Sequence, residues 1–123
     1  QIMKIYISGA ITDPTTGKPR ADFASAFNSA ATYLKSLGHE PVNPADPSLA
    51  SKANGMQWVD YIARDVKLVS ECDGIYFLAG WMPSDGAQIE KLVADHLGKR
   101  VFYPHCPPED VKQPAPKATD TKK

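Results

Sequence analysis

The chain has 123 residues, of which 42% are hydrophobic and 23% charged, close to the averages of globular proteins. This length leaves room for one domain with one core and excludes a second domain. The 14 acidic and 14 basic side chains cancel, and no segment gathers the Lys and Arg of a duplex-binding surface, so polymeric nucleic acid is not an expected partner. No apolar run approaches the ~20 residues that span a bilayer, and we expect a cytoplasmic protein without membrane association.

The N-terminal third of the chain predicts a strand, a helix and a short second strand. Residues 3–7 are rich in β-branched and aromatic side chains and stop at Ser8-Gly9, which is typical of a strand that feeds a tight loop. Apolar residues recur at helical spacing over 22–37, with a capping residue at each end. Residues 41–44 contain two prolines, which confine this strand to a sheet edge or a strand end.

The middle of the chain predicts a loop, a helix and a buried strand. Residues 44–55 form the loop, and the apolar positions between Trp58 and Val69 form the stripe of an amphipathic helix. Residues 73–78 have the continuous apolar character of a strand that is covered on both faces, as in a parallel sheet.

The last elements complete an alternating pattern of strands and helices. A loop over 80–86 leads to a helix that ends at Gly98, and residues 100–103 form the next strand. This alternation predicts an α/β fold, a flavodoxin-like or Rossmann-like three-layer sandwich whose parallel sheet has four or five strands, with the first strand central. We expect the domain to cover 3–104, and the polar, Pro/Lys-rich residues 105–123 to form a mobile tail.

Sheets of this kind bind ligands beyond the carboxyl ends of their strands. The loops that begin at Ser8 and Ala79 lie at this edge. Gly9 lets a ligand approach the backbone closely, and Ser84 precedes a helix whose amide groups attract an anion. Both residues have an ordinary alternative, since Gly9 can serve only to turn the chain and Ser84 can serve as the N-cap.

Two carboxylates on the predicted helices are candidates for chemistry. Asp65 lies at the margin of an apolar stripe, where burial of a lone carboxylate is costly unless it is paired or functional. Its alternative is an ion pair with Arg64 or Lys67, although adjacent residues on a helix point in different directions. Glu90 lies one turn into the last helix, and its alternative is a surface residue that complements the helix dipole. Asp73 is more typical of a structural turn.

Metal and cofactor motifs are not found in the sequence. His39, His96 and His105 share no metal-ligand spacing with the carboxylates or thiols, and we expect them at the surface. Cys72 and Cys106 lack the CxxC spacing and are predicted to be free thiols. Because the glycine-rich dinucleotide and P-loop motifs are also missing, we expect no metal and no cofactor.

Three short motifs, in their order and separation, resemble the nucleoside 2-deoxyribosyltransferase-like superfamily. They are Lys4-Ile5-Tyr6-Ile7-Ser8-Gly9, then Asp65 eight residues before Asp73, then Ser84 six residues before Glu90 in Gly86-Ala87-Gln88-Ile89-Glu90. The likeness covers about residues 3–103. It is strongest to a small uncharacterised branch common in phage and bacterial genomes, and the chain is also similar to the deoxynucleoside 5′-monophosphate N-glycosidases.

The resemblance implies roles for particular residues. It implies that Glu90 attacks the anomeric carbon, that Asp65 assists at the base or sugar, and that Tyr6 lies near the sugar. It also implies a set of substrate contacts: Ser8, Gly9, Ala10, Ile11, Asp73, Trp81, Ser84 and Gly86. The chain departs from the N-glycosidases at Ala10 and Thr12, where those enzymes have a serine and an arginine that hold the 5′ phosphate. Lys18 and Arg20, in the loop over 12–21, are basic residues that could supply the missing charge.

These features predict an enzyme that cleaves or exchanges the N-glycosidic bond of a 2′-deoxynucleoside or its 5′-monophosphate. The alternative on the same fold is a non-catalytic sensor or scavenger that binds a nucleotide or an ADP-ribose-like ligand. We expect Asp65 and Glu90 to converge on one cleft. We also expect a homo-oligomer, because so small a domain leaves its pocket open and Trp81-Met82 forms an apolar pair after a strand.

Overall fold

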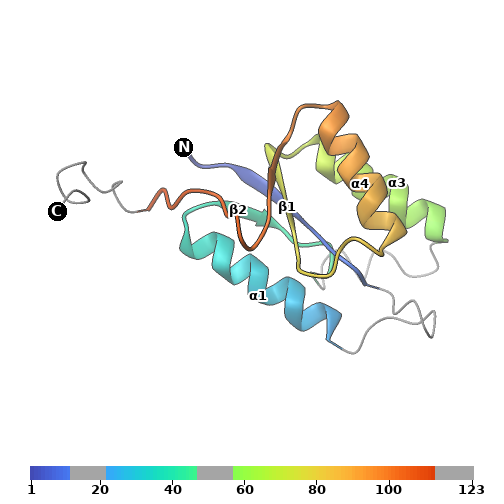
Figure 1. Cartoon of the computed structure of the whole chain (residues 1–123), viewed down its shortest axis with the longest axis horizontal. Helices are drawn as coiled ribbons and strands as arrows, with labels where there is room; N and C mark the ends of the chain where they lie inside the picture. Colours follow the sequence, from blue (N-terminus) through green and yellow to red (C-terminus); the bar gives the residue numbers. More distant parts are fainter. Residues whose placement is uncertain (12–21, 47–56, 113–123) are drawn as a thin grey trace.

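The computed structural model describes residues 1–11, 22–46 and 57–112, and its strands and helices alternate along the chain as predicted (Figure 1). The elements are β1 (Lys4–Ser8), α1 (Phe23–Ser36), β2 (Glu40–Val42), α3 (Trp58–Ser70), β3 (Gly74–Phe77), α4 (Asp85–His96) and β4 (Arg100–Phe102).

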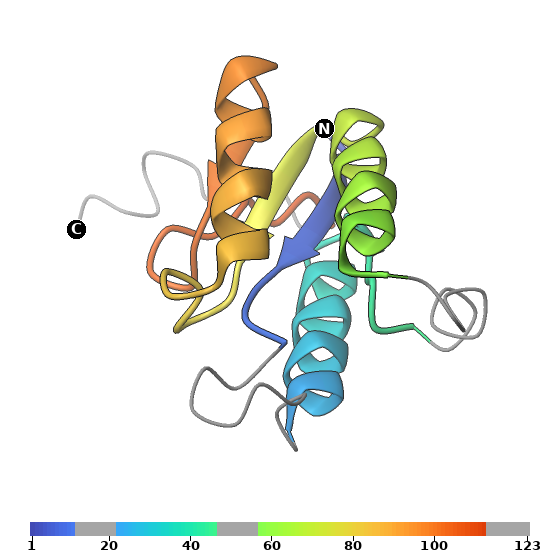
Figure 2. The same cartoon turned by 90° about the vertical axis from the view of Figure 1, so that its right-hand side faces the viewer.

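The four strands form one parallel sheet in the order β2-β1-β3-β4. The predicted α/β architecture is therefore confirmed, with β1 in the interior of the sheet between β2 and β3. Helix α1 covers one face of the sheet, and α3 and α4 lie side by side on the other (Figures 1 and 2). This arrangement gives the three layers of a flavodoxin-like sandwich.

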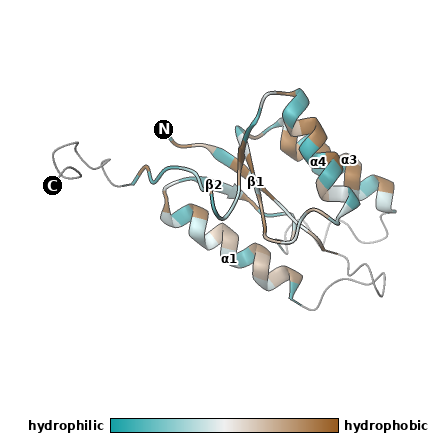
Figure 3. Ribbon diagram, in the orientation of Figure 1, coloured by the Kyte–Doolittle hydropathy of each residue, from teal (hydrophilic) through white to brown (hydrophobic). Residues whose placement is uncertain are grey.

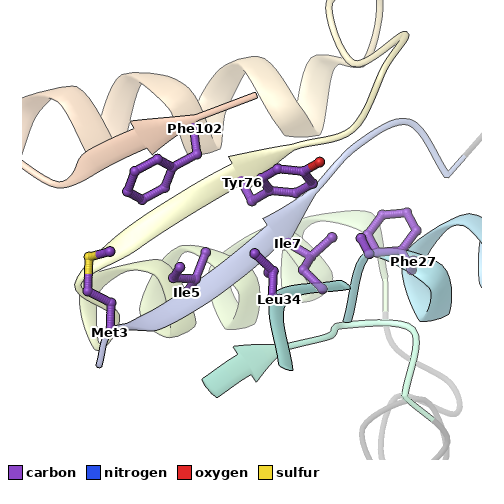
Figure 4. Close-up of a cluster of buried hydrophobic side chains, with 8 residues drawn as sticks. Met3, Ile5, Ile7, Phe27, Leu34, Tyr76 and Phe102 are labelled. Carbon is purple, nitrogen blue, oxygen red and sulfur yellow. The ribbon is translucent and has the colours of Figure 1, made fainter. Parts of the chain in front are cut away.

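The alternation of side chains along β1 divides the core into two clusters. Ile5 and Ile7 point toward α1, whereas Tyr6 and Ser8 point toward α3 and α4. The cluster under α1, shown in Figure 4, contains Met3, Ile5, Ile7, Phe27, Ala30, Leu34, Tyr76 and Phe102. The cluster under α3 and α4 contains Tyr6, Val69, Cys72, Ile75, Phe77, Ala87 and Ala94. Tyr6 and Ser8 thus place hydroxyl groups on the face of the sheet that α3 and α4 cover.

Helices α3 and α4 are amphipathic, and hydrophobic and hydrophilic residues mix around both (Figure 3). Several large apolar side chains near these helices face solvent instead of the sheet. They are Trp58, Val59, Met82 and Leu92, with exposed fractions of 59%, 64%, 66% and 70%. The apolar stripe predicted for residues 58–69 is therefore buried only in part, because Trp58 and Val59 begin the helix beyond the edge of the sheet.

His39 is buried, which corrects the expectation that it lies at the surface. Its imidazole Nδ1 accepts a hydrogen bond from the Met3 amide at 3.1 Å, and its Nε2 lies 2.7 Å from the Glu109 carbonyl oxygen. One ring nitrogen must accept and the other must donate, so these contacts fix a single neutral tautomer. The imidazole links the start of β1 to the C-terminal segment.

Residues 105–112, the first part of the predicted tail, contact the domain. The Val111 amide donates to the Leu37 carbonyl at 2.8 Å, at the end of α1. Gly38, with a φ of +93°, turns the chain there, and a Cβ at this position would lie 2.7 Å from the Val111 side chain. The Glu109 carbonyl and the Val111 amide thus attach this segment to His39 and to the end of α1. Residues 113–123 lie outside the described part of the chain.

Candidate active site

The candidate site lies at the carboxyl end of β1, on the face of the sheet that α3 and α4 cover. Ser8 is the last residue of β1 and pairs with Phe77, the last residue of β3. Glu90 comes from the second turn of α4 and Asp65 from the middle of α3, and both are buried, with 5% and 6% of their surface exposed. Burial of two carboxylates is costly unless their oxygens accept hydrogen bonds or pair with a positive charge.

Both carboxylate oxygens of Glu90 accept hydrogen bonds from hydroxyl groups of β1. The Tyr6 hydroxyl donates to Oε2 at 3.0 Å, and the Ser8 hydroxyl donates to Oε1 at 2.5 Å. Tyr6 and Ser8 are two residues apart on one strand, so the pleat places them on the same face of the sheet. The orientation of the Glu90 carboxylate is therefore set by a strand in the interior of the sheet.

The environment of Glu90 raises its pKa to about 7. Burial is the main cause, because it disfavours the charged form, and the negative charge of Asp65 acts in the same direction. The hydrogen bonds from Ser8 and Tyr6 and the charge of Arg64 oppose this rise. Burial, together with the charge of Glu90, also raises the pKa of Tyr6 well above its ordinary value, so its hydroxyl stays protonated and remains a donor.

Asp65 forms an ion pair with its neighbour Arg64. The guanidinium Nε and Nη2 both lie near Oδ1 of Asp65, at 3.0 and 2.9 Å. The ion pair with Arg64 that the sequence offered as an alternative is thus present, because the long Arg64 side chain turns back to the Asp65 carboxylate and lies over the Tyr61 ring, 5.6 Å from its centroid. Burial raises the pKa of Asp65, and the charge and hydrogen bonds of Arg64, together with a hydrogen bond from Tyr6, oppose that rise.

Asp65 and Glu90, 25 positions apart, meet at Tyr6. The Tyr6 hydroxyl bonds to Glu90 and also lowers the pKa of Asp65, and the charge of Asp65 raises the pKa of Glu90. The two carboxylates therefore face one hydroxyl group at one edge of the sheet, as the sequence led us to expect. Arg64 adds a positive charge that sequence reasoning had weighed only as an alternative.

The loop before α4 has clear structural roles. The Ser84 hydroxyl accepts from the Ala87 amide at 3.2 Å, so it is the N-cap of α4. A Cβ at Gly86 would lie 3.2 Å from the Ile62 side chain, which shows how closely the first turn of α4 packs on α3. These contacts support the ordinary readings of Ser84 and Gly86, and they leave room for a ligand role beside them.

The loop after β1 is also packed. A Cβ at Gly9 would lie 3.0 Å from the side chain of Leu78, so the close approach of two strand ends accounts for a glycine there. Ala10 is half-buried, and Ile11 packs against the apolar cluster under α1. Ile11 therefore lies on the opposite side of the sheet from Glu90, which does not fit its implied contact with the substrate.

Two further residues of the predicted site lie elsewhere or are partly covered. The Asp73 carboxylate accepts from the Lys4 amide at 2.9 Å, at the amino end of β1, which fits the structural turn that the sequence suggested for it. Trp81 is half-buried, with its ring centroid 4.4 Å from that of Phe77. Only Met82 of the expected exposed pair faces solvent freely.

The described ranges contain no group of three His, Cys, Asp or Glu side chains that could hold a metal ion. Within the same ranges, no helix is both long and apolar enough to cross a membrane. Residues 12–21 and 47–56 lie outside the described chain, and with them Thr12, Lys18 and Arg20.

Comparisons with known proteins show the family to which the chain belongs and a solved structure with a similar fold. Residues 3–103 match the family described as a domain of unknown function, DUF4406, and the chain therefore belongs to it. No curated protein matches the sequence. Among solved structures, the chain is similar to a 2-desoxiribosyltransferase from Leishmania mexicana, with a TM-score of 0.55 and 21% identity, over 81% of this chain and 62% of that one. The chain thus spans less than two thirds of that protein's length, and the similarity shows a common fold.

Proposed function

We propose that this member of the DUF4406 family cleaves or exchanges the N-glycosidic bond of a 2′-deoxynucleoside or its 5′-monophosphate, with Glu90 as the nucleophile. The observation that carries the proposal is the Glu90 carboxylate itself, buried at the carboxyl edge of the sheet with Tyr6 and Ser8 on its two oxygens. The fold that the chain has in common with a 2-desoxiribosyltransferase supports the same class of reaction.

The first step of the proposed reaction is a displacement at the anomeric carbon. An oxygen of Glu90 forms a bond with C1′ while the C1′–N bond breaks, and the electron pair of that bond goes to the departing base, which takes up a proton from solvent water. A glycosyl ester on Glu90 results. In the second step water or another base attacks C1′ and gives up a proton to solvent, the ester C–O bond breaks, and Glu90 leaves as a carboxylate. Attack by water gives hydrolysis, and attack by a base gives exchange.

The neighbours of Glu90 support this role in different ways. The hydroxyl groups of Tyr6 and Ser8 orient the carboxylate and favour its charged form, which is the nucleophile. Because burial raises the pKa of Glu90 to about 7, the charged fraction grows as the pH rises through neutrality. Asp65 stands beside the same hydroxyl group, where it can act on the base or the sugar. Trp81, Ser84 and Gly86 border the start of α4 and remain candidates for contacts with the substrate.

The test is incubation of the full chain with a panel of 2′-deoxynucleosides and their monophosphates, followed by chromatography for free base. Release of base without an acceptor identifies a hydrolase, and exchange only with added base identifies a transferase. Glu90→Gln should lower turnover by roughly 10³-fold or more while ligand binding persists. Glu71→Gln is the matched control, since Glu71 is exposed and pairs with Lys67. Thermal stabilisation by a ligand without any turnover would overturn the proposal and favour the non-catalytic nucleotide binder.

We also infer that copies of this chain associate into a homo-oligomer. Exposed apolar side chains gather on and before the helices that frame the site, at Trp58, Val59, Met82 and Leu92. Large apolar side chains in such number are more typical of an interface than of a free surface.

A further inference from the structure

The ion pair between Arg64 and Asp65 is more constrained in its geometry than an ordinary surface ion pair. Two guanidinium nitrogens converge on the single oxygen Oδ1, at 3.0 and 2.9 Å. Adjacent side chains leave a helix about 100° apart, so the arginine must bend back to reach this oxygen. Its stacking on Tyr61 further restricts the side chain. The pair is therefore fixed at both ends, with 22% of the Arg64 side chain and 9% of the Asp65 side chain exposed.

Groups from three elements face the Asp65 carboxylate. Arg64 approaches from α3, the Tyr6 hydroxyl from β1, and the negative charge of Glu90 from α4. Arg64 is the positive charge among these groups. Burial disfavours a charged Asp65, and the charge and hydrogen bonds of Arg64 oppose it.

We propose that Arg64 is a positioning residue of this site, which fixes one oxygen of Asp65 and keeps the carboxylate ionised, so that Asp65 meets the substrate as a hydrogen-bond acceptor. This inference rests on the proposed function and narrows its substrate class. The substrate must present an N–H or O–H donor to Asp65. Such a donor comes from an amino or imino group of the base or from a hydroxyl group of the sugar.

The donor requirement follows from the cost of an unpaired charge. A bound ligand shields Asp65 from water, and an analogue without the donor leaves the ionised oxygen without a partner. We expect such an analogue to bind about 10- to 100-fold more weakly than its parent. A nucleoside without the exocyclic amino group and one without the 3′-hydroxyl group distinguish the two sources of the donor.

The first experiment measures the titration of Asp65 directly and needs no activity. The ¹³Cγ signal of Asp65 is followed by NMR against pH in the wild type, Arg64→Met, Arg64→Gln and Lys67→Met, with the amide spectrum as the check of folding. The midpoint should move to higher pH by at least about one pH unit in both neutral Arg64 variants, because the favourable charge is lost. Lys67→Met, which removes an exposed charge of the same helix, should leave it in place. An unchanged midpoint in either folded Arg64 variant overturns the proposal.

The second experiment tests the consequence for the reaction. In Arg64→Met the acid limb of the kcat/KM profile should move to higher pH, since both Asp65 and Glu90 must be ionised and the charge of Arg64 lowers the pKa of each. Adding Arg64→Met to Asp65→Asn should cause no further loss if Arg64 acts through Asp65. A displaced alkaline limb would show Asp65 to be a proton donor and would overturn the acceptor role. If no substrate turns over, the proposed function fails while the NMR result still decides whether Arg64 positions Asp65. If both donor-free analogues bind as tightly as the parent nucleoside, the inferred substrate class is wrong, but the role of Arg64 is not affected.

Discussion

At Glu90, burial and hydrogen bonding shift the pKa of the carboxyl group in opposite directions. Burial favours the neutral acid, whereas the donors Tyr6 and Ser8 favour the carboxylate, and the result is a pKa of about 7 against an ordinary value of 4.5. A folded state with the raised pKa binds the proton more tightly than the unfolded chain does. The stability that Glu90 contributes is therefore complete below about pH 4.5 and is lost as the pH rises through about 7.

This balance predicts the effect of Glu90→Gln on stability. The neutral amide removes the cost of burying a charge, so the variant should exceed the wild type in free energy of unfolding at pH 8 by an amount on the order of 3 kcal/mol. The gain should shrink toward zero near pH 5. Urea unfolding at the two pH values measures it, with Glu71→Gln as the exposed control. A gain that is equal at both pH values would argue against a strongly raised pKa.

At the scale of single residues, the sequence indicated the candidate catalytic residues but not their hydrogen-bond and ion-pair partners. The resemblance singled out Tyr6, Asp65 and Glu90, whereas the helical pattern alone favoured a surface role for Glu90. The hydrogen bonds between β1 and α4 are long-range contacts that no local pattern encodes. The bend of Arg64 onto Asp65 also depends on the flexibility of a long side chain, which the spacing rules for helices do not describe.

At the scale of elements, β1 connects the core and the site through its period of two. Ile5 and Ile7 anchor one face, and Tyr6 and Ser8 supply the other face with hydroxyl groups. The position of every strand and helix followed from the apolar periodicity of the sequence. The C-terminal segment did not, because its order depends on hydrogen bonds to His39 and to the end of α1.

The bridge through His39 gives a prediction for the C-terminal segment. His39→Leu removes the partner of the Met3 amide and of the Glu109 carbonyl while it keeps an apolar body in the buried space. We expect the free energy of unfolding to fall by about 2–4 kcal/mol, measured by urea denaturation. His96→Leu, at the exposed end of α4, serves as the matched control. Similar losses in the two variants would show that the bridge does not stabilise the fold.

At the scale of the whole molecule, the order of the sheet brings distant residues together. Helices α3 and α4 cover the same face, and their contact brings Asp65 and Glu90 to one hydroxyl group of the strand beneath. The alternation of elements predicted this layering, since right-handed crossovers restrict the topologies available. Asp73 bonds to the amino end of β1, whereas Ser8 and Glu90 meet at the carboxyl end of the same strand.

The inferred homo-oligomer is tested by light scattering. The exposed apolar side chains around α3 and α4 predict a mass above the 13.4 kDa of one chain in dilute solution. Met82→Glu, which places a charge on this surface, should shift the population toward the monomer. Ile2→Glu carries the same change at the amino edge of the sheet, where Ile2 is 69% exposed, and should leave the mass unchanged. A monomeric wild type would end this inference.

The most direct test of the central claim is a search for the glycosyl ester on Glu90. The full chain is mixed with a 2′-deoxynucleoside that it turns over, quenched in acid within the first turnover, and analysed by mass spectrometry of the intact protein and of its peptides. We predict an added mass of one deoxyribosyl group on the peptide that contains Glu90, and its loss in Glu90→Gln. An adduct on another residue, or undiminished turnover in Glu90→Gln, would contradict the assignment of Glu90 as the nucleophile.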